Sequence, residues 1–116
     1  MDQLQELISN SVIVDYTPMG VFMTPQIPSI DPKNLLTNEI TSWLEKHSAT
    51  MSYTEQGITV EAETKRNNYS STISGFHNND PIIAAERVIR KAERTYKRIG
   101  KNSRRLDKIV QERNRD

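Results

Sequence analysis

The sequence predicts an α+β fold in which a three-stranded antiparallel sheet carries two helices packed on one face, the second helix being long and basic. Residues 51–76 alternate apolar and polar side chains, a pattern typical of half-buried strands. Segments 33–48 and 80–116 instead repeat apolar residues at helical spacing. Because each helix has one apolar stripe and the sheet one apolar face, we expect both helices on the same side of the sheet.

The composition indicates one domain with a modest core. The chain has 116 residues, of which 34% are hydrophobic, and it has no cysteine, which excludes a disulfide-stapled scaffold. No apolar run approaches the ~20 residues that span a bilayer, and no basic, apolar start resembles a signal peptide. We therefore expect a cytoplasmic protein without a membrane partner.

Residues 1–32 are predicted to form a short helix followed by a Pro-rich extended arm. Apolar residues at helical spacing over 2–9 indicate the helix, and the β-rich run 11–16 indicates a short strand. Four prolines within 17–32 argue against a continuous helix or a central strand. The apolar residues of this arm are expected to pack on their own domain or on a partner.

The first long helix is predicted over 33–48. Asp31 can cap its start and Pro32 can occupy its first position. Trp43 lies on the apolar stripe and is expected to anchor the core, while His47 fits a helix-terminal cap better than a metal ligand.

Three strands are predicted next, over 51–54, 58–63 and 69–74. The segment 55–57 forms a tight connection, and the Arg-Asn-Asn run at 66–68 forms a turn, because Asn tolerates the left-handed conformation.

The second helix is predicted to begin at Asp80, with Pro81 at its first position. Its apolar residues alternate three and four apart, as in a heptad seam. This seam consists of Ile82, Ala85, Ile89, Ala92, Tyr96, Ile99, Leu106 and Val110. Gly100 disfavours a helix interior, so we assign 33–99 to an α-β-β-β-α domain and 100–116 to a basic helical extension.

The opposite face of this second helix is predicted to be cationic and to contact nucleic acid. Residues 80–116 carry a net charge of +6, whereas residues 1–79 carry −5. An asymmetry of this kind indicates either an interaction surface or a long exposed helix that is charged for solubility. The candidate nucleic-acid-binding residues are Arg87, Arg90, Lys91, Arg94, Lys97, Arg98, Lys101, Arg104, Arg105 and Lys108.

The α-β-β-β-α order resembles the double-stranded RNA-binding domain. The local matches are residues 32–36 in the first helix, 58–62 in the middle strand and Ala84-Ala85 in the second helix. This family binds duplex RNA partly through a histidine-containing loop and a lysine cluster at the second helix. Here the loop 55–57 has no histidine and the helix start has no lysine, so the resemblance implies the fold and not those contacts.

Enzyme chemistry finds little support in the sequence, and we predict no catalytic residue, metal site, cofactor or small-molecule substrate. No glycine-rich phosphate loop is present, and His47 and His77 fit no zinc-ligand spacing. Glu61 and Glu63 share one face of a strand, where they either bind a cation or are solvated.

The leading functional hypothesis is a non-enzymatic module that binds nucleic acid, RNA before DNA, through the cationic helix face. The alternative is a protein-interaction or assembly subunit, such as a viral or mobile-element protein or an inhibitor of a host enzyme. In that alternative the seam residues Ile99, Leu106 and Val110 pair with another helix, in the simplest case by self-association.

Overall fold

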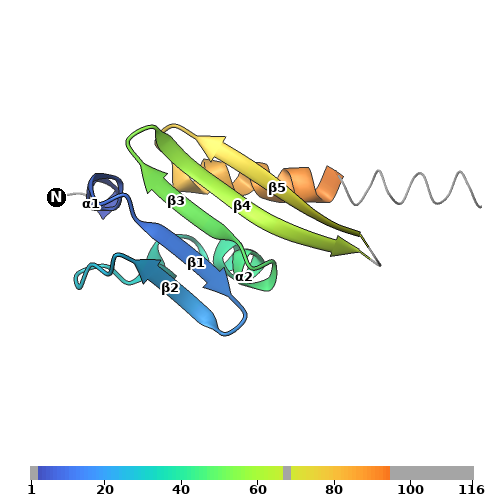
Figure 1. The fold of residues 1–116 in the computed structure, drawn as a ribbon, viewed down its shortest axis with the longest axis horizontal. Helices are drawn as coiled ribbons and strands as arrows, with labels where there is room; N and C mark the ends of the chain where they lie inside the picture. Colours follow the sequence, from blue (N-terminus) through green and yellow to red (C-terminus); the bar gives the residue numbers. More distant parts are fainter. Residues whose placement is uncertain (1–2, 67–68, 95–116) are drawn as a thin grey trace, which may run out of the picture.

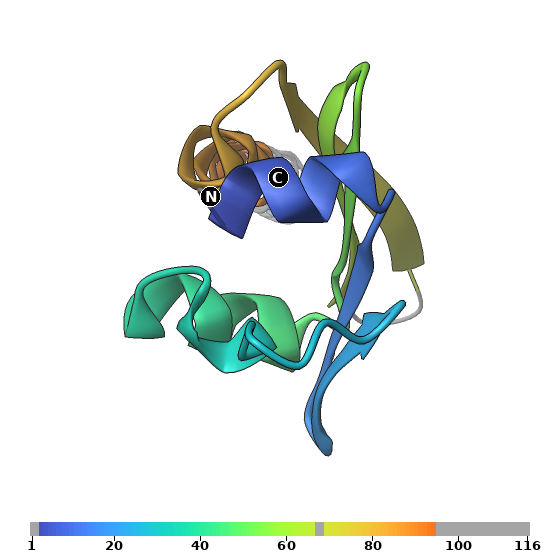
Figure 2. The ribbon, with the colours of Figure 1, turned by 90° about the vertical axis from the view of Figure 1, so that its left-hand side faces the viewer.

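The protein folds as a five-stranded antiparallel sheet with helices on one face (Figures 1 and 2). The computed structural model describes residues 3–66 and 69–94. The elements are, in chain order, α1 (Gln3–Ser9), β1 (Ile13–Thr17), β2 (Gly20–Thr24), the 3-10 helix η1 (Pro32–Asn34), α2 (Asn38–Lys46), β3 (Thr50–Thr54), β4 (Gly57–Arg66), β5 (Tyr69–His77) and the C-terminal helix, described over residues 81–94. The strand order is β2-β1-β3-β4-β5.

The prediction of a three-stranded sheet with two helices was wrong. Strands β1 and β2 extend the sheet beyond β3, with Val14 opposite Met51 and Met23 opposite Val14. All three side chains are buried, so the N-terminal segment supplies part of the core. The predicted short helix and the strand at 11–16 are confirmed as α1 and β1, but their place in the fold was missed.

Strand β2 escaped prediction because of the prolines around it. Pro18 lies in the turn between β1 and β2, and Pro25 follows the last residue of β2, so neither occupies a ladder position. The Thr17 hydroxyl closes the turn, accepting from the Met19 amide (3.1 Å) and donating to the Gly20 carbonyl (2.9 Å). The short stretch between these two prolines suffices for an edge strand, where proline is tolerated.

The predicted helix at 33–48 is in fact two elements. Asp31 caps only the short η1, accepting a hydrogen bond from the Lys33 amide (3.0 Å). A second cap, Thr37, accepts from the Ile40 amide (3.4 Å) and begins α2. Two successive N-cap residues thus divide the segment, because each offers its side chain to the amides that follow it. His47 is the C-cap of α2, as predicted.

The core lies between the sheet and the helices. Tyr16, Leu44, Met51, Tyr53 and Val88 are among its largest fully buried side chains. Among the apolar residues of the predicted helices and strands, Leu36, Ile40, Leu44, Val60 and Ala92 are buried, and Trp43, Ile73 and Ile89 are partly buried against the core.

The opposite face of the sheet is left open by the helices (Figure 2). Strand alternation sends Glu61 and Glu63 to this face and Val60 and Ala62 to the core. No described helix is long and apolar enough to cross a membrane.

Candidate nucleic-acid interface

The start of the C-terminal helix is fixed by two side chains. Asp80 Oδ1 accepts hydrogen bonds from the amides of Ile82 (2.9 Å) and Ile83 (3.4 Å), which confirms the predicted N-cap. His77 Nδ1 accepts from the Asp80 amide (2.8 Å), so the end of β5 is tied to the start of the helix. The polar role of His77 is therefore structural.

A glycine on β5 lets this helix lie against the sheet. A Cβ atom on Gly75 would come within 2.6 Å of the Ala84 carbonyl oxygen and 2.9 Å of the Val88 amide nitrogen. These are backbone atoms, which cannot rotate out of the way. The absence of a side chain at Gly75 thus sets the close approach of helix and strand.

The buried side of the C-terminal helix matches the predicted seam only in part. Ala85 and Ala92 of the seam are buried and Ile89 is partly buried, whereas Ile82, the first residue of the seam, is 37% exposed. Ala84 and Val88, which lie outside the seam, are also buried. The small side chains allow the helix to pack closely on β5, and this rotates Ile82 away from the core. At 3.6 residues per turn, the side opposite the buried stripe centres on Arg90.

The four described cations of this helix form two rows. Arg87 Nη1 donates to the carbonyl oxygen of Phe76 (2.6 Å), and Lys91 Nζ donates to that of Ser74. Arg90 and Arg94 are exposed and lie one turn apart on the outer side. The other six predicted residues, Lys97, Arg98, Lys101, Arg104, Arg105 and Lys108, and the seam residues from Tyr96 onward, lie outside the described residues.

Arg87 and Lys91, which form the inner row, cover an edge of the sheet. β5 is an edge strand, and the carbonyls of Ser74 and Phe76 are the groups that Arg87 and Lys91 engage. Charged side chains over an edge strand hinder pairing with another chain. Sequence reasoning assigned these two cations to ligand binding alone and could not see this structural contact.

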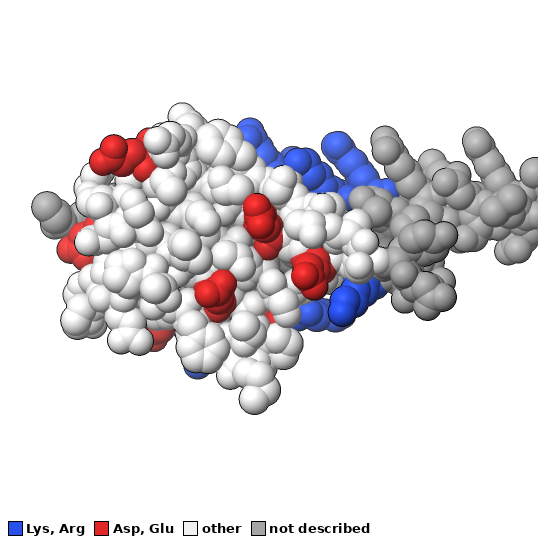
Figure 3. Space-filling view, in the orientation of Figure 1, with Lys and Arg blue, Asp and Glu red and all other residues white. Residues whose placement is uncertain are grey.

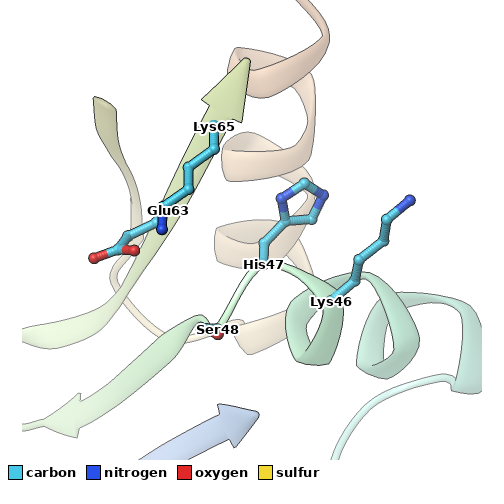
Figure 4. Close-up of a pocket in the computed structure, with 5 residues that line it drawn as sticks. All are labelled: Lys46, His47, Ser48, Glu63 and Lys65. Atoms are coloured by element: carbon cyan, nitrogen blue, oxygen red, sulfur yellow. The ribbon is translucent and has the colours of Figure 1, made fainter. Parts of the chain in front are cut away.

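A second group of basic residues lies where α2 and β4 end. Lys46, His47, Ser48, Glu63 and Lys65 line an open surface hollow, and Lys46 and His47 project from the end of α2 (Figure 4). The His47 ring stacks on Trp43 at a centroid distance of 4.1 Å. Burial lowers the pKa of His47, so at neutral pH the lysines supply the positive charge of this hollow. Lys46 and Lys65 were missed because single lysines at element ends form no sequence pattern.

Charge is divided between the surfaces of the molecule. Figure 3 views the open sheet face, on which separate carboxylates appear, with lysine and arginine at its margins. Asp15, Glu61 and Glu63 belong to the strands of that face. A polyanion would therefore meet repulsion on the sheet and attraction along the C-terminal helix.

Comparison with family models, curated proteins and solved structures gave no match. The resemblance to the double-stranded RNA-binding domain thus stays a prediction. Within residues 3–66 and 69–94, no three His, Asp or Glu side chains gather as a metal site would require.

Proposed function

We propose that this protein is a non-enzymatic binding module that contacts nucleic-acid phosphates, RNA before DNA, through the cationic side of its C-terminal helix. The observation that carries the proposal is the side-by-side placement of four exposed cations, Arg87, Arg90, Lys91 and Arg94, on a helix fixed to the sheet. Cations held in this way neutralise phosphates and release counterions.

The fixed helix favours phosphate contact over base reading. Arg90 and Arg94 extend from the outer side of the helix, and Arg87 and Lys91 already use a donor on the strand edge. The open sheet face carries carboxylates, which disfavours that face as a nucleic-acid platform. We therefore expect binding with weak sequence preference.

The proposal is tested by fluorescence anisotropy with labelled RNA and DNA, as duplexes and single strands, over a series of salt concentrations. Log affinity should fall linearly with log salt, with a slope of about −0.9 per phosphate neutralised on duplex DNA and about −0.7 on single strands. The variant Arg90→Gln/Arg94→Gln should bind more weakly. Its slope should be shallower by about 1 for each phosphate that the missing arginines no longer neutralise.

The matched control is Lys33→Gln, which removes one positive charge from η1, outside both basic groups, and is compared with the single variant Arg90→Gln. It should retain most of the affinity if the helix is the binding element. Equal weakening in both variants, or no affinity tighter than the non-specific range of about 10⁻⁴–10⁻⁶ M on any probe, would reject the helix as a nucleic-acid site.

Docking to an acidic protein is the rival use of the same cationic side. It is distinguished by the same experiment, because a protein-docking helix need not bind labelled RNA or DNA. Under this alternative function, the protein would be an interaction or assembly subunit, such as a viral or mobile-element protein or an inhibitor of a host enzyme.

A further inference from the structure

The open sheet face combines carboxylates with exposed apolar side chains. Ile13, Phe22 and Phe76 are 43%, 57% and 48% exposed, although they lie within regular strands. The pairing register places Ile13 opposite Ser52 and Thr59 opposite Phe76, on the same side of the sheet. The phenylalanine rings lie over neighbouring glycines, which fixes their position on this face.

The carboxylates of this face form a short cross-strand pattern. Asp15 pairs with Thr50, and Thr50 pairs with Glu61, so Asp15 and Glu61 are two strands apart, or about 10 Å at the usual strand spacing. Glu63 lies two residues further along β4, about 7 Å from Glu61. Thr50 donates to Asp15 Oδ1 (3.0 Å), which orients that carboxylate.

The C-terminal helix carries cations at a matching spacing. Arg90 and Arg94 are separated by about 6 Å along the helix axis, close to the Glu61–Glu63 spacing. Both arginines are exposed and point away from the core, unlike the inner row that contacts β5. The chain therefore carries carboxylates on its open sheet face and arginines on its C-terminal helix. The two sets of charges have similar spacing and lie on separate surfaces.

We propose that the open sheet face binds the C-terminal helix of a second copy of this chain, with Arg90 and Arg94 against Glu61 and Glu63. Phe76 on β5, opposite Thr59 and beside the Glu61–Glu63 row, supplies the apolar part of the contact. Charge complementarity aligns the two copies, and burial of this exposed ring adds a favourable hydrophobic contribution.

The two surfaces lie on different sides of the molecule, so the association is head to tail (Figure 2). A contact between two different surfaces leaves one surface of each kind unused in a dimer, and further copies can add. The assembly should therefore grow with protein concentration. The inference uses the same two arginines as the proposed nucleic-acid contact, so the two uses would compete, but self-association does not require that nucleic acid binds.

Sedimentation velocity on nuclease-treated full-length protein tests the inference. The weight-average mass should rise with concentration at an ionic strength of about 0.01 M and return to the monomer at about 1 M, where the Debye length falls from about 30 Å to about 3 Å. Glu61→Gln/Glu63→Gln and Arg90→Gln/Arg94→Gln should each remain monomeric. The control Glu39→Gln/Glu45→Gln, which changes two carboxylates of α2 on the other side of the sheet, should associate like the wild type.

Mixing the two variants gives the decisive measurement. The Arg90→Gln/Arg94→Gln chain keeps its sheet face, and the Glu61→Gln/Glu63→Gln chain keeps its helix. The mixture should therefore form dimers and no assembly larger than a dimer. A wild-type protein that stays monomeric at low salt, a sheet variant that associates unchanged, or a mixture that fails to pair would overturn the inference. Nucleic-acid affinity of the sheet variant, measured in parallel, reports separately on the proposed function.

Discussion

At the residue scale, the most informative side chain is Tyr16, which sequence reasoning treated only as part of a short strand. It is 1% exposed, and its hydroxyl finds no hydrogen-bond partner among the described residues. Burial, with a smaller contribution from the charge of Glu45, raises the pKa of Tyr16. Burial likewise raises the pKa of Tyr53, with a smaller contribution from Tyr16. The core therefore favours both phenols in the neutral form.

These raised pKa values predict alkaline unfolding. Above pH about 10 the tyrosines of the unfolded chain lose their protons, while the folded chain keeps them. The unfolded state then binds fewer protons, so the free energy of unfolding falls as pH rises. Tyr16→Phe should make this fall shallower, and at neutral pH it should leave stability unchanged or raise it by up to about 1 kcal/mol, because a buried unpaired hydroxyl is costly. Urea unfolding at pH 7 and above pH 10 measures both effects; a clear drop in stability at pH 7 would mean that the hydroxyl has a partner.

At the element scale, prediction succeeded where the pattern was local and failed where it depended on neighbours. The alternation at 58–63 identified β4, and Asp80 identified the start of the C-terminal helix. The buried side of that helix was predicted only in part, because Ala85 and Ala92 of the seam are buried but Ile82 is exposed. Ala84, which the seam did not include, is fully buried, and its carbonyl meets Gly75 at the closest approach to the sheet. Heptad spacing could not reveal that Ala84, and not Ile82, would lie at this contact.

The two rows of cations on the C-terminal helix should differ in their effect on stability. Arg87→Gln/Lys91→Gln removes two charged donors from the carbonyls of β5 and should lower the free energy of unfolding by roughly 0.5–1 kcal/mol. It should also raise aggregation on heating, because the edge strand is then without its charged cover. Arg90→Gln/Arg94→Gln, which leaves the hydrogen bonds to β5 intact, should melt like the wild type. Thermal melts monitored by circular dichroism and light scattering compare the pair, and equal melting of all three proteins would show that these hydrogen bonds are not stabilising.

At the scale of the whole molecule, the candidate site was only partly predictable. The charge asymmetry between residues 1–79 and 80–116 located the basic helix, and four of its ten candidate residues fall within the described structure. The acidic character of the open sheet face could not be foreseen, because Asp15 and Glu61 are far apart in the sequence and meet only through β3. The predicted number of strands was wrong for the same reason, because the pairing of β1 with β3 joins segments that are far apart in the sequence.

The last prediction concerns residues 1–32, which the sequence suggested were an appendage to an independent α-β-β-β-α domain. They contribute six of the nineteen buried apolar side chains within the described residues, and β1 lies between β2 and β3 in the sheet. A fragment of residues 33–116 would expose the β1-facing edge of β3 and leave Met51 and Tyr53 without their N-terminal neighbours. The free energy lost by removing about a third of the buried apolar side chains exceeds the small net free energy of unfolding of a domain of this size. The fragment should therefore not fold. Circular dichroism and amide proton NMR of the fragment measure this directly. A cooperative melt with dispersed amide resonances would contradict it and would restore 33–99 as a self-sufficient domain.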